Sequence, residues 1–485
     1  MVRRRVVLLP AVVIAAGLPL AGAALGSSPA CGSELAPPPL SFGNRVYIDK
    51  TRAGGEPVSV VAQDGSINVS SHAGTTHIYK DPSAIPGATD FAVGYGNETL
   101  NWRSTDGGKT WKYVGLPIAN AGPHSATSTG FSDPDYAIDA SGRIYNTEIN
   151  LANVSVFSSG DDGQTYSRGN PEVTSGDRPW LTGGHENEVY LYVNTLQQIF
   201  RSGDGGVTWT LQSQGNAKGP DAKMYIDPAN PRTGLIGPHN PQGVAISADQ
   251  GKTWKAYDGA NLGPTVDFFG AVAVDKAGNV YRAAAGGYKG SSDTKPDGSV
   301  TFNYFDRKTQ SWAPEAVTIP SGPGDMLWPW VVAGDDGRVA VTWFQSKPGK
   351  PTDFYLYVAQ TLNAHGTTVT CANGTKKFVP PQWTVTNASH TPIHHGPICL
   401  NGTNCNASTD FPSGDRRLGD FATINYDKDG RLFVTAGDTM LLNPLGGPKP
   451  VSNPIFLAAT SGAKMIKHQM HTRATKPSCT VNPAC

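Results

Sequence analysis

The sequence has no excess charge of either sign, no Cys-x-x-Cys pair and no long stretch with the apolar spacing of a helix. Its 39 Lys and Arg residues balance 39 Asp and Glu residues, so its charge gives no reason to expect nucleic acid or an anionic membrane as a partner. The absence of Cys-x-x-Cys spacing disfavours a zinc or redox site. After residue 30 apolar residues do not recur with a helical period, which excludes a helix-rich fold.

Glycine and strand-forming residues are abundant instead. The 485 residues include 57 Gly and 38 Pro, and only 16% are charged. This composition favours short strands joined by tight turns, and therefore an all-β protein. A chain of this length usually divides into two or three domains, unless a repeat joins it into one.

The N-terminus predicts export. Residues 1–24 combine a basic start (Arg3 to Arg5), an apolar stretch and small residues suited to cleavage, which is typical of a signal peptide. Pro10 and Pro19 interrupt the apolar stretch, so a membrane anchor is disfavoured. We expect a secreted protein without a transmembrane anchor, with residues 25–43 as a linker and residues 461–485 as a tail.

The cysteine count agrees with export. An even number of cysteines in an exported chain indicates disulfides, although the sequence leaves their pairing open. Close spacing would allow small loops at 399–405 and at 479–485, the second of which would stabilise the tail. The six cysteines are Cys31, Cys371, Cys399, Cys405, Cys479 and Cys485.

Two patterns repeat along the chain. The first is Ser-x-Asp-x-Gly-x-Thr followed by Trp or Tyr, at 104–111, 159–166, 202–209 and 247–254. The second is a strand, a turn rich in Asp, Asn and Gly, and another strand. Units of this second kind begin near residues 56, 133, 177, 221, 267, 325 and 419.

The period of the units predicts a β-propeller. The starts at 133, 177, 221 and 267 are 44, 44 and 46 residues apart, which suits a blade of four antiparallel strands. We expect seven blades within residues 44–460, with six as the alternative because the first and last units are less regular. Residues 44–50 would supply the last blade's fourth strand and close the ring. Residues 386–418 form an insertion before that blade.

The first pattern resembles the Asp-box, or bacterial neuraminidase repeat, of sialidase-like propellers. The resemblance implies that each box forms the turn between the third and fourth strands of a blade, on the face away from the ligand site. It does not extend to the catalytic residues, because sialidases begin the propeller with Arg-Ile-Pro, whereas Arg45 and Arg52 stand here in other contexts. The family's arginine triad and Tyr–Glu pair cannot be assigned to positions of this chain.

Every unit begins at or near an acidic residue. If the first strands line the channel, these acids would form a ring around one mouth. Carboxylates held that close raise one another's pKa or bind a cation, which suits a glycosidase pair or a calcium site. The alternative is that each acid only caps the turn into its own strand. The seven acids are Glu56, Asp133, Asp177, Asp221, Asp267, Asp325 and Asp420.

Candidate roles follow from this arrangement. An acid/base or nucleophilic role is predicted for Asp133, Asp177, Asp420 and Tyr136. Substrate binding is predicted for Arg178, Arg416, Arg417, Asp221, Asp267 and Asp325. Paired arginines would hold an anion, although each arginine could equally pair with a neighbouring Asp to fix the inserted loop.

The function predicted from the sequence is that of an exported, monomeric propeller that acts on or binds extracellular carbohydrate. Channel-mouth carboxylates would make it a glycoside hydrolase. No cofactor is assigned with certainty, and Ca²⁺ is the candidate. The alternative is a non-catalytic binding or scaffold propeller at the cell surface, stabilised by Ca²⁺. A lyase on the same fold stays open, because a fold does not fix a function.

Overall fold

The structure is a computed structural model. It describes residues 31–32, 35–50, 52, 54–72, 100–115, 132–149, 154–169, 176–290, 293, 297–347, 350–402, 415–442 and 452–467. The predicted signal peptide, most of the predicted tail and the cysteines Cys405, Cys479 and Cys485 lie outside these residues. Within them, the protein has no helix of the length and apolarity that crossing a membrane requires.

The described residues form seven antiparallel sheets of four or five strands, which are the predicted blades, and one separate hairpin. Blade 1 contains β3 (Val58–Val61), β4 (Ile67–Ser71), β5 (Leu100–Ser104) and β6 (Lys112–Tyr113). Blade 2 contains β7 (Ser132–Ile138), β8 (Ile144–Ile149), β9 (Val154–Ser159) and β10 (Ser167–Gly169). Blade 3 contains β11 (Pro179–Gly183), β12 (Val189–Val193), β13 (Gln198–Ser202) and β14 (Thr210–Ser213). Blade 4 contains β15 (Tyr225–Ile226), β16 (Leu235–His239), β17 (Gly243–Ser247) and β18 (Lys255–Asp258).

The later blades are less regular. Blade 5 contains β19 (Val272–Val274), β20 (Val280–Gly286), β21 (Ser299–Asp306), β22 (Ser311–Trp312) and β23 (Val317–Thr318). Blade 6 contains β24 (Met326–Ala333), β25 (Val339–Lys347), β26 (Lys350–Thr361), β29 (Thr384–Asn387) and β30 (His394–His395). Blade 7 contains β31 (Thr423–Tyr426), β32 (Leu432–Asp438) and β33 (Asn453–Ser461), completed by β1 (Ser41–Phe42) and β2 (Val46–Tyr47).

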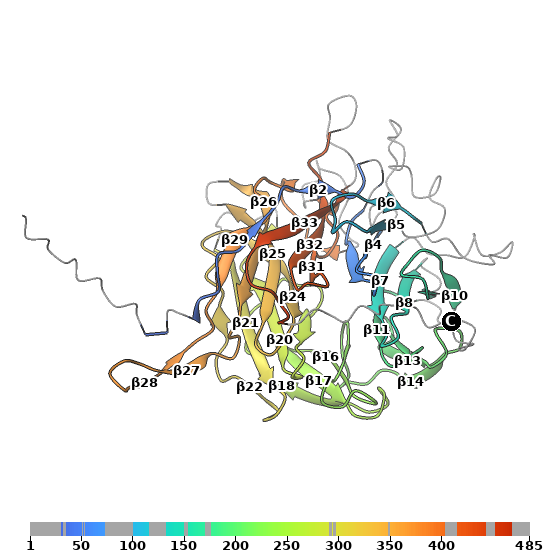
Figure 1. Ribbon diagram of the computed structural model, residues 1–485, viewed down its shortest axis with the longest axis horizontal. Helices are drawn as coiled ribbons and strands as arrows, with labels where there is room; N and C mark the ends of the chain where they lie inside the picture. The colour runs from blue at the N-terminus through green and yellow to red at the C-terminus, as the bar shows by residue number, and fades with distance from the viewer. Residues whose placement is uncertain are drawn as a thin grey trace, which may run out of the picture.

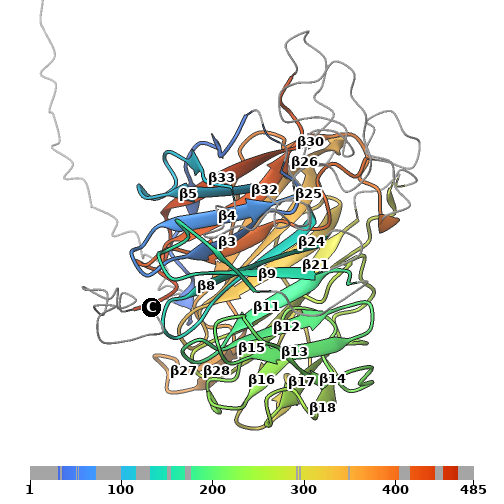
Figure 2. The ribbon, with the colours of Figure 1, turned by 90° about the vertical axis from the view of Figure 1, so that its right-hand side faces the viewer.

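The two ends of the described chain close the ring. Strand β2 pairs with β33, with Val46 opposite Phe456, and β1 pairs with the end of the same strand. The first strands of blades 1 and 7, β3 and β31, also contact each other. Figures 1 and 2 show blue and red strands side by side here. Seven blades and closure by the N-terminal segment are therefore confirmed.

The repeated Asp/Gly motif forms the turn between the third and fourth strands, as predicted. In blade 1 the Asp106 carboxylate accepts hydrogen bonds from Lys109 N (3.0 Å), Thr110 N (2.9 Å) and Thr110 Oγ1 (2.6 Å). These bonds lower the pKa of Asp106 to about 2. Gly108 has φ 87°, and a Cβ there would lie 2.1 Å from Phe456, so this position requires glycine. The other three copies repeat the pattern around Asp161, Asp204 and Asp249.

A disulfide joins Cys31 to Cys371, a pairing that the sequence left open. Cys371 lies in the turn between β27 (Thr367–Thr370) and β28 (Lys376–Val379), a hairpin inserted before the fourth strand of blade 6. This hairpin, which the sequence analysis did not predict, projects from the propeller in Figure 1. Cys399 is also disulfide-bonded.

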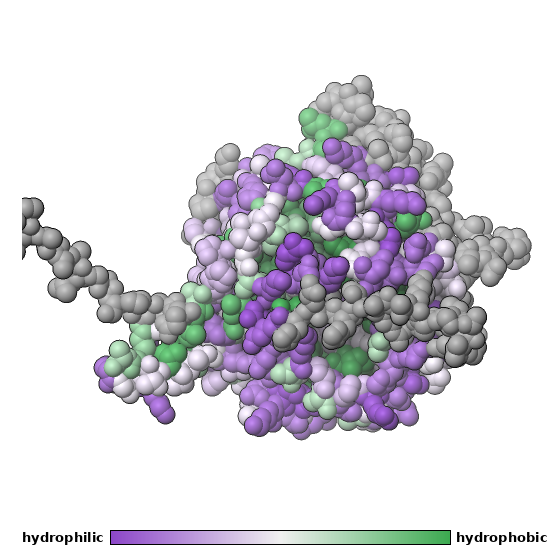
Figure 3. All heavy atoms as spheres, viewed as in Figure 1, coloured by the Kyte–Doolittle hydropathy of each residue, from purple (hydrophilic) through white to green (hydrophobic). Residues whose placement is uncertain are grey.

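Aromatic side chains from four blades fill the centre of the ring. Trp180 of β11 lies 5.8 Å from Trp330 of β24, 5.9 Å from Phe421 and 5.6 Å from Phe269, measured between ring centroids. Trp180 is fully buried. We call these four side chains the aromatic plug. On the face drawn in Figure 3, hydrophilic side chains cover most of the described surface, in keeping with apolar packing inside.

Candidate functional site

Charged side chains gather where the blades enter the channel, against the aromatic plug. Arg178 immediately precedes β11, and its guanidinium carbon lies 4.1 Å from the Trp180 ring and 4.4 Å from the Phe421 ring. Only 2% of Arg178 is exposed. Stacking on two aromatic faces fixes the guanidinium plane and compensates part of its lost hydration.

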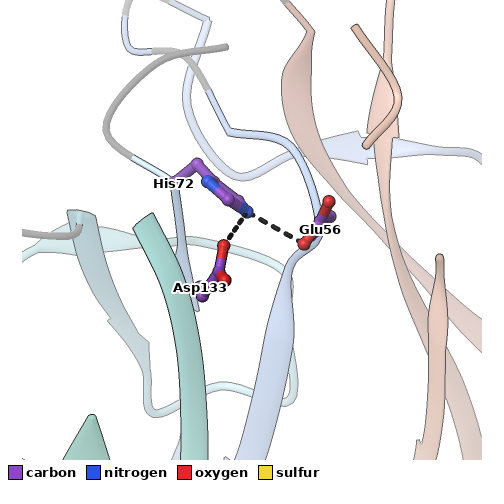
Figure 4. A group of neighbouring side chains, drawn as sticks. All are labelled: Glu56, His72 and Asp133. Carbon is purple, nitrogen blue, oxygen red and sulfur yellow. Dashed lines mark hydrogen bonds and ion pairs between the residues drawn. The ribbon is translucent and has the colours of Figure 1, made fainter. Parts of the chain in front are cut away.

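Glu56, His72 and Asp133 meet at one point of the channel mouth (Figure 4), and Arg178 lies next to two of them. His72 Nε2 lies 2.9 Å from Glu56 Oε2 and 3.7 Å from Asp133 Oδ1. The Ser132 hydroxyl donates to Asp133 Oδ1 (2.7 Å) and lies 2.9 Å from His72 Nδ1. Nε2 of His72 therefore faces the two acids, and Nδ1 faces the hydroxyl of Ser132. These contacts link the four side chains (the two acids, the histidine and the serine) into one network.

Glu56 is the most buried acid of this network, with its side chain 2% exposed. Burial alone would raise its pKa, but His72, Arg178 and Arg416 outweigh burial and hold the pKa well below its ordinary value. Arg178 Nη1 lies 3.2 Å from Glu56 Oε2. Close packing from blade 7 is possible because residue 419 is glycine: a Cβ at Gly419 would lie 2.2 Å from Glu56 Cγ.

Asp177 and Asp133 form a pair of neighbouring carboxyls from blades 3 and 2. Partial burial and the charge of Asp133 raise the pKa of Asp177 to about 6, although Arg178 opposes this rise. Asp177 is partly exposed to solvent, whereas the Asp133 side chain is only 13% exposed. Asp133 Oδ2 also accepts the Arg178 backbone N–H at 3.1 Å. An accessible carboxyl of raised pKa thus lies beside one that is hydrogen-bonded to the protein.

Arg416 and Asp420 complete the cluster from blade 7. Their side chains form an ion pair, and Arg416 Nη2 lies 4.0 Å from Glu56 Oε1. Burial and the charge of Glu56 raise the pKa of Asp420 to about 6. We call the set the mouth cluster; its members are Glu56, His72, Asp133, Asp177, Arg178, Arg416 and Asp420.

The backbone of this cluster is strained. Glu56, Asp133 and Arg178 have φ angles of 48°, 53° and 48°, in the left-handed region that residues with a Cβ avoid. Such conformations cost of order 1–3 kcal/mol each and concentrate at functional sites. The strain turns the three side chains toward one another across three blades.

The remaining predicted acids do not join this cluster, which corrects the expectation of one ring. Asp221 and Asp267 flank the Arg282 guanidinium instead. Asp325 lies near Asp293 and Asp297, whose charges add to burial in raising its pKa to about 6. The predicted acids therefore fall into three groups: the mouth cluster, the pair at Arg282, and Asp325 with its two neighbouring aspartates.

Two further candidates lie in structural positions. Tyr136 is 4% exposed, its hydroxyl donates to Asn101 Oδ1 at 2.6 Å, and burial raises its pKa well above the ordinary value. This placement opposes the predicted nucleophilic role, because a buried neutral phenol is a poor nucleophile. Arg417 forms an ion pair with Asp415 (2.6 Å) and so fixes the inserted segment, the alternative role foreseen for these arginines.

The donor set of Glu56, His72 and Asp133 could in principle hold a metal, since their ligand atoms lie within 4.8 Å of one another. Arg178 Nη1, however, already lies 3.2 Å from Glu56 Oε2 and 4.0 Å from Asp133 Oδ1. A guanidinium beside the same oxygens repels a cation, so the trio fits an ion-pair network better than a metal site.

Sequence reasoning missed four residues of this region. His72, Ser132 and Arg282 carry no motif, and Phe269 reads as an ordinary apolar residue. One signal was available for the first of these. His72 directly follows β4, the second strand of blade 1. Because neighbouring strands are antiparallel, a second strand ends at the same mouth where the first strand begins.

Comparison with known proteins gives partial resemblances. No family model matches the sequence. A curated sialidase from Micromonospora viridifaciens is 28% identical over 187 residues, covering 34% of this chain and 25% of the relative. A GH74 enzyme from Niastella koreensis is 14% identical with a TM-score of 0.45, covering 85% of this chain and 61% of that structure. A Hadza microbial sialidase is 16% identical with a TM-score of 0.38, covering 62% of this chain and 66% of that structure.

The sialidase relative supports the resemblance expected from the repeated motif, but only in part. This chain spans a quarter of that relative's length (25%), at 28% identity. The match is not a clear one to a catalytic sialidase. The two solved structures resemble this chain weakly, with TM-scores below 0.5.

Proposed function

We propose that the chain is an exported propeller that binds an extracellular carbohydrate at the mouth cluster and hydrolyses a glycosidic bond there. The observation that carries the proposal is the pairing of an accessible carboxyl of raised pKa, Asp177, with a strained and buried ion-pair network. A general acid works best when its pKa lies near the pH of the reaction, and about 6 suits that role.

The roles divide between Asp177 and Asp420. Asp177 would donate its proton to the leaving oxygen as the C–O bond breaks. Water would then bond to the anomeric carbon and lose a proton to Asp420, whose ion pair with Arg416 favours the ionised form that a base requires. Asp133, held by Ser132 and the Arg178 amide, would keep Asp177 protonated through its charge.

Arg178 supports an anionic substituent on the substrate. Its Nη1 bonds Glu56, whereas its buried Nε and Nη2 have no hydrogen-bond partner among the described residues. Buried donors without an acceptor raise the free energy of the protein, and a carboxylate or similar anion would satisfy both at once. Such a ligand would have to displace the side chains that cover these two nitrogens.

Export is supported by the disulfide between Cys31 and Cys371, because disulfides persist in oxidising compartments. The signal peptide at residues 1–24 and a monomeric state are part of the proposal.

A turnover screen tests the proposal. Secreted protein is incubated with a panel of aryl glycosides that includes a sialoside, and release of the aryl group is measured. We expect release from at least one substrate. Turnover should be lost in Asp177→Asn, with a melting temperature near that of the wild type. Turnover should also be lost in Asp420→Asn, where removal of the counter-ion of the buried Arg416 should lower the melting temperature as well. Asp161→Asn, in a repeated turn on the opposite face, is the matched control: it should lower stability and keep turnover. Strong destabilisation by Asp177→Asn would instead assign a capping role.

A second candidate function is a calcium-stabilised binding propeller without hydrolysis. The observation that favours it is Asp325, which is 1% exposed and lies near Asp293 and Asp297. Its Oδ1 has no hydrogen-bond partner in the part of the chain that the structure describes. Acids grouped around an unbonded carboxylate oxygen suit Ca²⁺. Here EDTA should lower the melting temperature of the wild type but not of Asp325→Asn, and the glycoside panel should show no turnover.

A further inference from the structure

A pocket of about 240 Å³ adjoins the mouth cluster over blades 3, 4 and 5. Phe269 forms a wall common to both: it lines the pocket, and its ring lies 5.5 Å from the Arg178 guanidinium carbon. A group bound at Arg178 and a group bound in the pocket would therefore be close enough to belong to one ligand. We call this cavity the blade 3–5 pocket.

The base of the pocket carries both a guanidinium and carboxyl groups. Arg282 is 5% exposed, and its Nη1 donates to His239 O (2.8 Å) and Gly243 O (2.7 Å). Asp221 and Asp267 flank this guanidinium, and burial raises the pKa of both carboxyls, that of Asp267 to about 7. An anion would meet two carboxyl groups here and a cation would meet Arg282, so both are disfavoured.

The rim of the pocket offers free hydrogen-bonding groups. Gln197 and Asn240 are exposed, and within the described part of the chain neither side-chain amide forms a hydrogen bond. Each amide supplies two donors and an acceptor. Together with the face of Phe269, they offer an uncharged, hydroxyl-bearing ring both an apolar surface and polar partners.

We propose that the blade 3–5 pocket is a subsite for an uncharged sugar ring. The protein would then recognise a glycan in which a neutral residue in the pocket adjoins the residue held at Arg178. The second half of this statement rests on the proposed function of the mouth cluster, whereas binding of a neutral ring by the pocket does not.

Ligand-observed NMR tests the pocket directly. Saturation transfer is measured from the protein to three probes: methyl β-galactopyranoside, methyl β-glucopyranoside and methyl α-mannopyranoside. We expect transfer to the ring protons of at least one probe. The double variant Gln197→Gly/Asn240→Ala should weaken its affinity about tenfold, the effect of losing two ordinary hydrogen bonds. Glycine is chosen because residue 197 has φ 48°, where another side chain would add strain.

The matched control is Gln164→Ala, which removes an exposed amide from a repeated turn of blade 2 and should leave affinity unchanged. Absence of transfer to all three probes, or equal affinity in the double variant, would overturn the proposal. Failure of the proposed function is a separate outcome. Sugar binding without turnover of any aryl glycoside would support the subsite and contradict only the proposed hydrolysis. Turnover without neutral-sugar binding would contradict only the subsite.

Discussion

Replacement of Glu56 by glutamine should strongly destabilise the protein. The side chain is 2% exposed and lies 2.9 Å from His72 Nε2, 3.2 Å from Arg178 Nη1 and 4.0 Å from Arg416 Nη2. Glutamine keeps the shape but removes the charge that compensates two buried guanidinium groups. Breaking a buried ion pair from one side costs about 3–5 kcal/mol, and we expect a loss of that size in the free energy of unfolding.

The assay is urea unfolding at neutral pH, with Arg178→Met as the second arm of a double-mutant cycle. If the loss arises from the uncompensated guanidinium, the double variant Glu56→Gln/Arg178→Met should lose less stability than the sum of the two single variants. Coupling between contacting groups is about 0.5–3 kcal/mol. The dependence of the free energy on urea should keep its slope, since the surface exposed on unfolding does not change.

The pH dependence gives a second check on the same reasoning. Because the folded state holds the pKa of Glu56 below its ordinary value, its stabilisation is present above that value and is lost as the pH falls below it. The difference between wild type and Glu56→Gln should therefore shrink in acid. A loss under about 1 kcal/mol, or a cycle in which the two substitutions add, would refute the assigned role of Glu56 as counter-ion.

Three further predictions concern the turns, the acid and the hairpin. Asp106→Ala should cost about 1–2 kcal/mol in urea unfolding at neutral pH, as loss of a capping carboxylate does, and the difference should fade toward pH 2 because the pKa of Asp106 is lowered to about 2. If Asp177 is the general acid and Asp420 the base, turnover should be highest near pH 6 and decline on either side, and a rate that keeps rising above pH 6 would contradict the assignment. Cys371→Ser should increase amide hydrogen exchange in β27 and β28, measured by mass spectrometry, while exchange in β11 and β12 stays unchanged.

The blades were predictable because each unit repeats its own turn chemistry. Asp and Gly at fixed spacing specify a turn wherever they occur, so four copies of one motif and the seven unit starts gave the period without knowledge of any pairing. The hairpin of β27 and β28 was not predictable in this way. Its Thr, Val and Lys residues suit a blade strand equally well, and only pairing with each other instead of β26 distinguishes them.

The site was predictable in part. The repeat placed Asp133, Asp177 and Asp420 at one mouth, and the structure brings them together. It could not reveal that Asp221, Asp267 and Asp325 would lie in groups of their own. Side-chain direction depends on backbone angles, and no local sequence pattern predicts the φ of 48° at Arg178. His72 and Arg178, 106 positions apart, both contact Glu56 because blades 1 and 3 bring their mouth-side ends together around the channel.

The acids at the blade entries do not all have the same role: some accept backbone N–H groups and hold the structure, whereas Asp177 remains accessible for chemistry. Asp133 accepts the N–H of Arg178, and Asp267 accepts the N–H of Trp328, and both donors have a positive φ, 48° and 53°. These two acids therefore hold the strained entry of a neighbouring blade, which is an architectural task and explains their recurrence. Asp177 differs because it is partly exposed and its raised pKa stems first from burial and then from Asp133. Repetition thus supplies the fixed carboxylates, and the acid that remains accessible beside one of them is the position where chemistry has the freedom to act.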